Sequence, residues 1–312
     1  MSSSTVIPLR SGLSDSTRGW LLGALGVLAF AFTIPMTRLA GGDAAAPQLS
    51  PVFVAVGRAA VAGLLALAWL LAVRAPRPRP GQWRVLALAV VGVVFGFPLC
   101  IGLAVRHVDA AHAAVVTGVL PIATAAMGAW WLRQRASLGF WLCAALGTAL
   151  VLGFAAWKSG SGLQPADALL MAAVLFGGFG YVQCARLFTG PQAMPPAQVI
   201  SWVLVLALPL TLPVSAWLLL AAWPAHAVHA PAWLGFAYVS LISMWLGFFP
   251  WYRGLALGGT LRVSQVQLLQ PFLSMWLAVP LLGESLDGPT VAFSLAVMAT
   301  VFVSRRQSAA PR

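Results

Sequence analysis

The sequence predicts an all-α integral membrane protein in which ten transmembrane helices form two inverted five-helix repeats. Three observations lead to this fold class: an apolar composition, a motif that occurs twice, and basic residues gathered at the ends of apolar runs. Of the 312 residues, 61% are hydrophobic and 8% are charged, whereas a soluble domain has about 25% charged residues. A soluble fold of this length could not bury so much apolar surface, so we expect the lipid bilayer as its solvent.

An internal repeat relates the two halves of the chain. Residues Phe97–Ala104 and Phe249–Ala256 share the pattern Phe-Pro, three free positions and Gly-Leu-Ala. A repeat at about half the chain length predicts two copies of one structural unit. Further along, Thr117, Pro121 and Thr124 correspond to Gln267, Pro271 and Ser274.

In the first half, five apolar runs of about 20 residues match the length of a membrane-spanning helix. Arg18 precedes the first run as in a signal peptide, but the run is too long and ends at Arg38. We therefore expect an uncleaved span, with cleavage near the small residues 44–46 as the alternative. The Arg/Pro-rich residues 74–80 and the residues 133–135 mark loops. The expected spans are 20–40, 51–73, 83–105, 111–132 and 138–157.

A flexible Gly/Ser segment separates the halves, and five further apolar runs follow it. The expected spans of the second half are 165–188, 199–222, 233–257, 261–282 and 290–303. The expected domains are a cytoplasmic N-terminal tail at 1–19, a first repeat at 20–157, a linker at 158–164, a second repeat at 165–304 and a cytoplasmic C-terminal tail at 305–312.

Basic residues predict the orientation. If both termini are cytoplasmic, thirteen of the 18 lysines and arginines lie in cytoplasmic segments and three lie outside. This bias follows the positive-inside rule for a bacterial-type inner membrane, and it explains the net charge of +12 without a nucleic-acid partner. Because five spans per half is an odd number, the second half should insert upside down, and such halves place a binding site at their interface.

These features resemble the drug/metabolite transporter superfamily, specifically its EamA-type ten-helix exporters. The resemblance covers residues 20–304 and rests on the duplication, on Gly-Leu-Ala before the spans with Pro121 and Pro271, and on Gly283–Leu286. It implies that spans one, three, four, six, eight and nine surround a central cavity, and that amino acids or other small metabolites are exported. Gln134 departs from the family pattern, which has a glutamate there.

Polar residues recur at helical spacing in the corresponding spans 111–132 and 261–282. Steps of three and four residues place them on one helix face, and each proline leaves a backbone carbonyl without its usual partner. We expect these faces to line a wet substrate path, with hydrogen bonding between neighbouring helices as the alternative. The candidate residues are Thr117, Pro121, Thr124, Gln267, Gln270, Pro271 and Ser274.

Aromatic residues form a second candidate surface. Trp245, Phe249 and Tyr252 share one broad face of the span 233–257, and Phe97 corresponds to Phe249. Such a face suits stacking against flat or amphipathic solutes, and aromatic residues that face lipid are the alternative. Further lining candidates in the first and sixth spans are Thr33, Pro35, Tyr181 and Gln183.

Arg58 is a charged residue about seven residues, or roughly 10 Å, into the second span. A charge at the bilayer centre costs about 2.5–3.5 kcal/mol, so Arg58 should face protein or water. The two candidate partners are an anionic substrate group, such as a carboxylate, and backbone carbonyls of the protein.

Acidic residues are absent from the middle of every expected span. We therefore expect neither proton coupling through a buried carboxylate nor cation export of the kind that uses a glutamate in the first helix. A single deep arginine also suits a polyanion poorly. Neutral or zwitterionic solutes remain, with amino acids as the leading candidate.

The overall expectation is an alternating-access secondary transporter for a small-molecule substrate, without enzyme activity, metal or cofactor. The three cysteines are widely spaced and no Cys/His metal pattern occurs. A membrane-embedded enzyme or lipid-handling protein is the alternative, although no catalytic set is clustered at one interface. Within transport, efflux of amphipathic drug-like compounds is the alternative. The sequence does not predict an oligomeric state.

Overall fold

A computed structural model describes residues 14–131, 137–160, 162–187, 192–258 and 263–308. Regular structure in these ranges is helical apart from one isolated bridge between Gly42 and Pro47. The first half contains α1 (Asp15–Ala31), α2 (Thr33–Gly41), α3 (Pro51–Ala72), α4 (Pro80–Ala89), η1 (Val90–Gly96), α5 (Phe97–Ala104), α6 (Ala110–Thr117), α7 (Leu120–Trp131) and α8 (Leu138–Ser159). The second half contains α9 (Pro165–Leu187), α10 (Pro196–Ala221), α11 (Ala230–Tyr238), η2 (Val239–Leu246), α12 (Phe248–Gly258), η3 (Ser264–Leu269), α14 (Gln270–Leu282) and α15 (Gly288–Ser308).

Eight helical segments of 21 to 27 residues are long and apolar enough to cross a membrane. Two shorter apolar helices, Val266–Leu282 and Gly288–Ser304, follow them. Large apolar side chains such as Trp130 and Leu220 are exposed on the molecular surface, where a bilayer would cover them. The predicted all-helical integral membrane class is confirmed, and the apolar helices lie where the sequence predicts spans.

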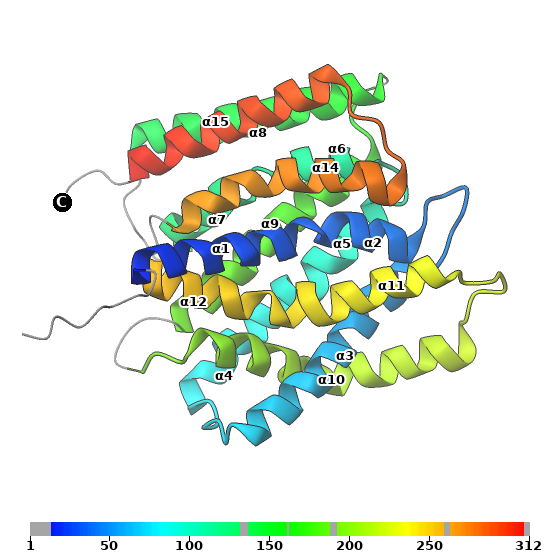
Figure 1. The fold of residues 1–312 in the computed structure, drawn as a ribbon, viewed down its shortest axis with the longest axis vertical. Helices are drawn as coiled ribbons and strands as arrows, with labels where there is room; N and C mark the ends of the chain where they lie inside the picture. The colour runs from blue at the N-terminus through cyan, green and yellow to red at the C-terminus, as the bar shows by residue number, and fades with distance from the viewer. Residues whose placement is uncertain (1–13, 132–136, 161, 188–191, 259–262, 309–312) are drawn as a thin grey trace, which may run out of the picture.

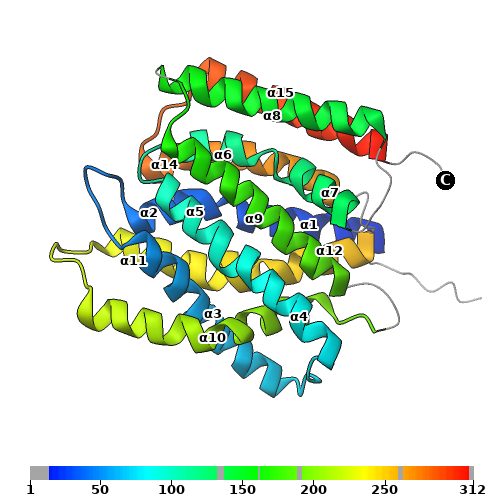
Figure 2. The same cartoon turned by 180° about the vertical axis from the view of Figure 1, so that it is seen from behind.

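The helices lie side by side in layers (Figure 1). The α8–α15 pair forms one edge of the molecule, and α3 packed on α10 forms the opposite edge. The segments α1–α2 and α9 run through the middle. Figure 2 shows from behind that α9 lies between the α6–α7 segment and the α4–α5 segment. The start of α1 and the end of α15 lie on the same side of the molecule.

The central helices pair across the two halves. The α1–α2 segment packs along α11 and α12, and α9 packs along α4, η1 and α5. Both pairs bring backbones into contact: a Cβ atom at Gly254 would lie 2.5 Å from the Gly23 nitrogen, and one at Gly92 would lie 2.7 Å from the Gly180 Cα. Only glycine permits these approaches.

Two segments of π-helix occur at corresponding places, just before the repeated Phe-Pro. Proline has no N–H and crowds the carbonyl four residues earlier. For Pro98 and Pro250 those carbonyls belong to Val94 in η1 and Leu246 in η2. The helix accommodates each proline by widening locally, and such π-bulges are frequent at functional sites.

Three further breaks also precede prolines. The chain turns at Phe32 between α1 and α2, before Pro35, and it turns again between α6 and α7, before Pro121. The third break is the 3-10 segment η3, which ends just before Pro271. In contrast, α10 continues through Pro209 and Pro213, so proline alone does not break a helix in this protein.

Loops at one end of the molecule are held together by polar contacts. Arg38 donates from Nη1 to the carbonyl oxygens of Val105 and Val108, the latter at 2.9 Å. Gly283 ends α14 with a left-handed φ of 70°, and the next residue, Glu284, accepts the first backbone N–H groups of α6. Lys158 pairs with Asp287. Gln134, where the family pattern has glutamate, lies outside the described residues.

Candidate functional site

A cavity lies in the middle of the molecule, between the two halves. It comprises two adjoining pockets that share Ile34, Thr117, Leu120, Gln267 and Gln270, and we call the whole space the central cavity. The larger pocket has a volume of about 70 Å³, enough for a few water molecules. A larger solute therefore needs the helices around it to move apart.

Six spans surround the central cavity, and all of them except α9 are interrupted. Its lining residues come mainly from α1–α2, η1–α5, α6–α7, α9, η2–α12 and η3–α14. These are the six spans that the family resemblance implies. Two further residues, Arg58 from α3 and Met298 from α15, also line it.

A cluster of polar side chains lies on one wall of the central cavity. Thr33 and Ser243 join through their hydroxyl groups at 2.8 Å, and Arg58 donates from Nη2 to Ser243 Oγ at 3.2 Å. Arg58 is 4% exposed, and its Nε has no hydrogen-bond partner. These contacts join α2 and α3 of the first half to η2 of the second half.

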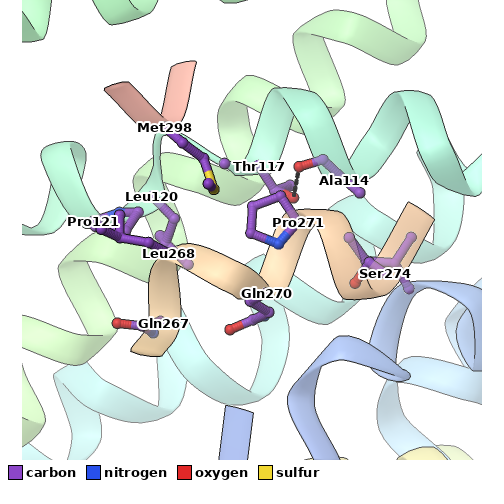
Figure 3. A pocket seen from close by; sticks show the side chains of 12 residues that line it. Ala114, Thr117, Leu120, Pro121, Gln267, Leu268, Gln270, Pro271, Ser274 and Met298 are labelled. Carbon is purple, nitrogen blue, oxygen red and sulfur yellow. Dashed lines mark hydrogen bonds between the residues drawn. The ribbon is translucent and has the colours of Figure 1, made fainter. Parts of the chain in front are cut away.

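The second wall consists of two glutamine amides. Gln267 and Gln270 line both pockets, and Figure 3 shows them along the same stretch of η3 and α14. Neither amide has a side-chain hydrogen bond within the described part of the chain, and both are half-buried. They can therefore donate to or accept from a solute in the cavity.

The hydroxyl groups near these amides bond to backbone. Thr117 donates to Ala113 O at 2.8 Å, within its own helix (Figure 3 shows its longer contact to Ala114). Ser274 instead donates across to Ala31 O at 2.5 Å. Ala31 is four residues before Pro35, so this hydroxyl replaces the N–H that the proline lacks.

Most of the residues predicted from the sequence line the central cavity, although their contact with a substrate stays a prediction. The cavity-lining members are Thr33, Arg58, Phe97, Thr117, Pro121, Tyr181, Gln267, Gln270, Pro271 and Ser274.

Three predicted aromatic residues lie away from the central cavity. Trp245 is buried, and its indole N–H donates to Ser201 Oγ on α10 at 2.9 Å. Phe249 packs on Trp69 with ring centroids 5.2 Å apart, and Tyr252 packs against Phe248. The prediction assumed α-helical spacing along the whole span. The π-helical segment η2 has more residues per turn than an α-helix, so the aromatic residues point in a different direction from the one that α-helical spacing gives.

Three other predicted residues also lie outside the cavity lining. Gln183 is fully buried, and its Oε1 accepts from Arg186 at 2.8 Å. Thr124 donates to Leu120 O of its own helix at 2.8 Å. Pro35 is buried in α2, where it frees the Ala31 carbonyl described above.

Three lining residues on η2 and α12 were not predicted from the sequence, namely Ser243, Met244 and Phe248. A signal for Ser243 was present. Ser240 and Ser243 are two hydroxyl residues one turn apart in the otherwise apolar stretch 239–251, and such residues need partners. In contrast, the sequence carried no recognisable signal for the π-helical geometry of η2.

A buried pair lies outside the central cavity. Asp167, in the first turn of α9, is 3% exposed, and its Oδ1 is 2.7 Å from His112 Nε2 on α6. The ring of Phe154 covers the histidine. Asp167 lies at a span end, in keeping with the absence of acidic residues from the middle of every expected span, but the sequence does not predict its depth of burial. The contact ties α6 to the first helix of the second half.

Two loop carboxyl groups have altered acidities. Burial raises the pKa of Glu284, and the N–H groups of Ala111 and Ala110 oppose this in part. The hydrogen bond from Lys158 lowers the pKa of Asp287 to about 2. Both carboxyl groups lie in the α14–α15 loop, so they can affect the helix ends without touching a solute in the cavity.

The chain matches a known family twice. The sequence pattern of the EamA-like transporter family fits residues 17–155 and fits again at residues 164–306. The chain belongs to the EamA-like transporter family. The double match within one chain shows that both halves are related to the same EamA-like unit.

Two individual proteins show the same relationship. "Uncharacterized transporter YdeK" of Bacillus subtilis (strain 168) is 43% identical over 294 residues, which are 94% of this chain and 99% of that protein. A protein of known crystal structure aligns with a TM-score of 0.61 and 18% identity over 94% of this chain and 98% of that one. The first likeness supports a membrane transporter, and the second concerns the fold alone.

Proposed function

We propose that this EamA-like protein is a secondary transporter that exports small neutral or zwitterionic metabolites, with amino acids as the leading class. The main support is the central cavity, which interrupted helices of both halves line together. Broken helices at the interface of two repeats are the usual place for transporter binding sites. We further propose a bacterial-type inner membrane with both termini in the cytoplasm.

The proposed mechanism is alternating access by two inverted five-span halves. Two of the ten proposed spans, Val266–Leu282 and Gly288–Ser304, are the shorter apolar helices. The packing between the halves supports the inverted arrangement. The first span of each half packs on the third span of the other half: α1–α2 packs on α11–α12, and α9 packs on α4–α5. These pairs run antiparallel: Gly23 faces Gly254 near one end, and Met36 faces Gly235 near the other.

Counterflow in proteoliposomes tests the transport function. Vesicles that contain the purified protein and an unlabelled amino acid should accumulate the labelled form of that amino acid transiently. Protein-free vesicles and vesicles with a drug-like amphipathic compound inside serve as controls. Turnover of a membrane lipid without solute exchange would instead favour the enzyme or lipid-handling alternative.

Labelling of single cysteines tests the inverted halves. In a variant without Cys100, Cys143 and Cys184, cysteines placed at Arg79 and Lys158 should react from opposite sides of the membrane. If both cysteines react from the same side, the inverted arrangement is wrong, and so is the proposed alternating-access mechanism.

A further inference from the structure

Arg58 is a buried cation that lacks an acidic partner. It is 4% exposed, its Nε is unbonded, and its one side-chain hydrogen bond among the described residues is to the neutral hydroxyl of Ser243. Taking a guanidinium out of water is costly unless an opposite charge and further hydrogen bonds replace the water. The question is therefore which group supplies the negative charge.

The protein's own acids do not supply it. All six aspartates and glutamates lie in the described ranges, and none is within 4.0 Å of Arg58. Three have other side-chain partners: Asp43 pairs with Arg38, Asp287 pairs with Lys158, and Asp167 lies 2.7 Å from His112. Glu284 binds the start of α6. The remaining two are Asp15, in the first turn of α1, and Asp109, at the start of α6.

Arg58 also lines the central cavity, so a solute there can approach it. Thr33 and Ser243 from one wall and Tyr181 from α9 line the same pocket. Thr33 and Ser243 share one hydrogen bond, so one of their two hydroxyl protons, together with the O–H of Tyr181, can be donated to an anion beside the guanidinium. A guanidinium fork matches the geometry of a carboxylate, and such charge-assisted hydrogen bonds are the strong ones.

We propose that the central cavity binds the carboxylate of its substrate at Arg58, so that the transported solutes are organic monocarboxylates or zwitterionic carboxylates. This inference rests on the proposed transport function and narrows it, since it excludes neutral solutes without a carboxylate. A single arginine balances one negative charge and would leave a dianion such as a phosphate monoester half compensated.

The rest of the solute is recognised more weakly. The cavity has no acid to pair with an ammonium group, and Gln267 and Gln270 offer neutral amide oxygens. Phe30, Phe97 and Phe248 provide apolar surface. The carboxylate is therefore the required feature, and an amino group is tolerated.

Paired acids and carboxamides test this proposal with the full-length protein in detergent. The probes are L-leucine, 4-methylpentanoate and 3-phenylpropanoate, together with the carboxamide of each, and the readout is the ligand-induced rise in melting temperature. At least one acid should bind at least about tenfold more tightly than its carboxamide, as expected for loss of a charge-assisted contact. Equal binding of acid and carboxamide, or no binding of any acid, would overturn the proposal.

Replacement of the arginine assigns the effect to one residue. Arg58→Gln should abolish the preference for acid over carboxamide, whereas Arg253→Gln removes an exposed cation of α12 and should preserve it. If Arg58→Gln does not fold, Arg58→Lys should reduce the preference, because an ammonium is a point charge without the planar fork. An unchanged preference in the Lys variant would contradict the proposal.

Counterflow separates this inference from the function on which it rests. If carboxamides exchange as fast as the corresponding acids, the proposed transport function still holds, but the proposed role of Arg58 is wrong. If no solute exchanges but the preference for acids is still measured in detergent, the proposed transport function is wrong, and the proposed carboxylate site at Arg58 still holds.

Discussion

The segments α6–α7 and η3–α14 correspond in the repeat, yet they use their polar residues differently. Thr117 and Thr124 bond back to carbonyls of their own helix. At the corresponding positions, Gln267 opens into the cavity and Ser274 reaches across to α1. The repeat thus preserves the positions of the polar residues but not their contacts. Of these two segments, we expect η3–α14 to make the hydrogen bonds to a solute.

The α6 segment is also the more firmly anchored of the two. Glu284 caps its first N–H groups, and His112 binds the buried Asp167 of α9. Such contacts fix a helix end, whereas free amides are available to a ligand. Four predictions test this division between an anchored segment and a segment that we expect to contact the solute.

The largest effect is expected for the buried pair. His112→Ala should lower the free energy of unfolding by about 3 kcal/mol, because it leaves Oδ1 of the buried Asp167 without its side-chain partner, while Oδ2 keeps only the N–H of Gln164. Lys158→Ala breaks a partly exposed pair and should cost no more than about 1 kcal/mol. Denaturation of the purified proteins in the same detergent measures both, and similar losses for the two variants would contradict the anchoring role.

The second prediction concerns the amides of η3 and α14. The double change Gln267→Ala and Gln270→Ala should slow solute exchange about tenfold, as expected for loss of hydrogen bonds worth about 1.4 kcal/mol. Stability should change little, because neither amide bonds to the described part of the protein. Counterflow and thermal unfolding measure the two quantities. Normal exchange in this variant would place recognition elsewhere.

The third prediction is a pH dependence at the cap of α6. Because burial raises the folded-state pKa of Glu284 above 4.5, ionisation of this group opposes folding. Wild-type stability should therefore fall relative to Glu284→Gln as the pH rises from below about 4.5 through the folded-state pKa. The difference should not exceed about 1 kcal/mol, since solvent screens a partly exposed carboxylate. Unfolding measured between pH 4 and 8 tests the sign, which would reverse if the two backbone N–H bonds outweighed burial.

The smallest effect is expected at the self-bonded hydroxyl of α7. Thr124→Val keeps the side-chain shape and removes a bond to the same helix, so stability should change by about 0.5 kcal/mol or less. Exchange should be unchanged. A large loss of exchange with normal stability would show that the two segments share recognition equally.

Composition and repeat were sufficient to predict the helical membrane class and the position of each apolar helix. Hydrophobic run length is a strong signal, because every spanning helix must cross the same thickness of lipid. Of the polar candidates, Thr33, Gln267 and Gln270 line the central cavity, and their contact with a solute stays a prediction. These predictions needed only the α-helical period and the cost of polar groups in lipid.

The aromatic face could not be placed from the sequence. Trp245 and Phe249 lie on one face, but that face meets Trp69 and Ser201 and not the cavity. The π-helix upstream of Pro250 changes the phase of the helix, and a proline does not reveal whether it causes a bulge, a kink or neither. The burial of Asp167 likewise depends on how α6 packs against α9, and the sequence of α9 alone does not reveal which helix packs on it.

The glycine contacts of α1 with α12 and of η1 with α9 have a mechanical consequence. Because the backbones are this close, we expect each pair, with one helix from either half, to move as one unit. The cavity lies between the two pairs. On this expectation, the protein would open to a solute through a change in the angle between the pairs, and larger side chains at Gly254 or Gly92 would separate the helices within a pair.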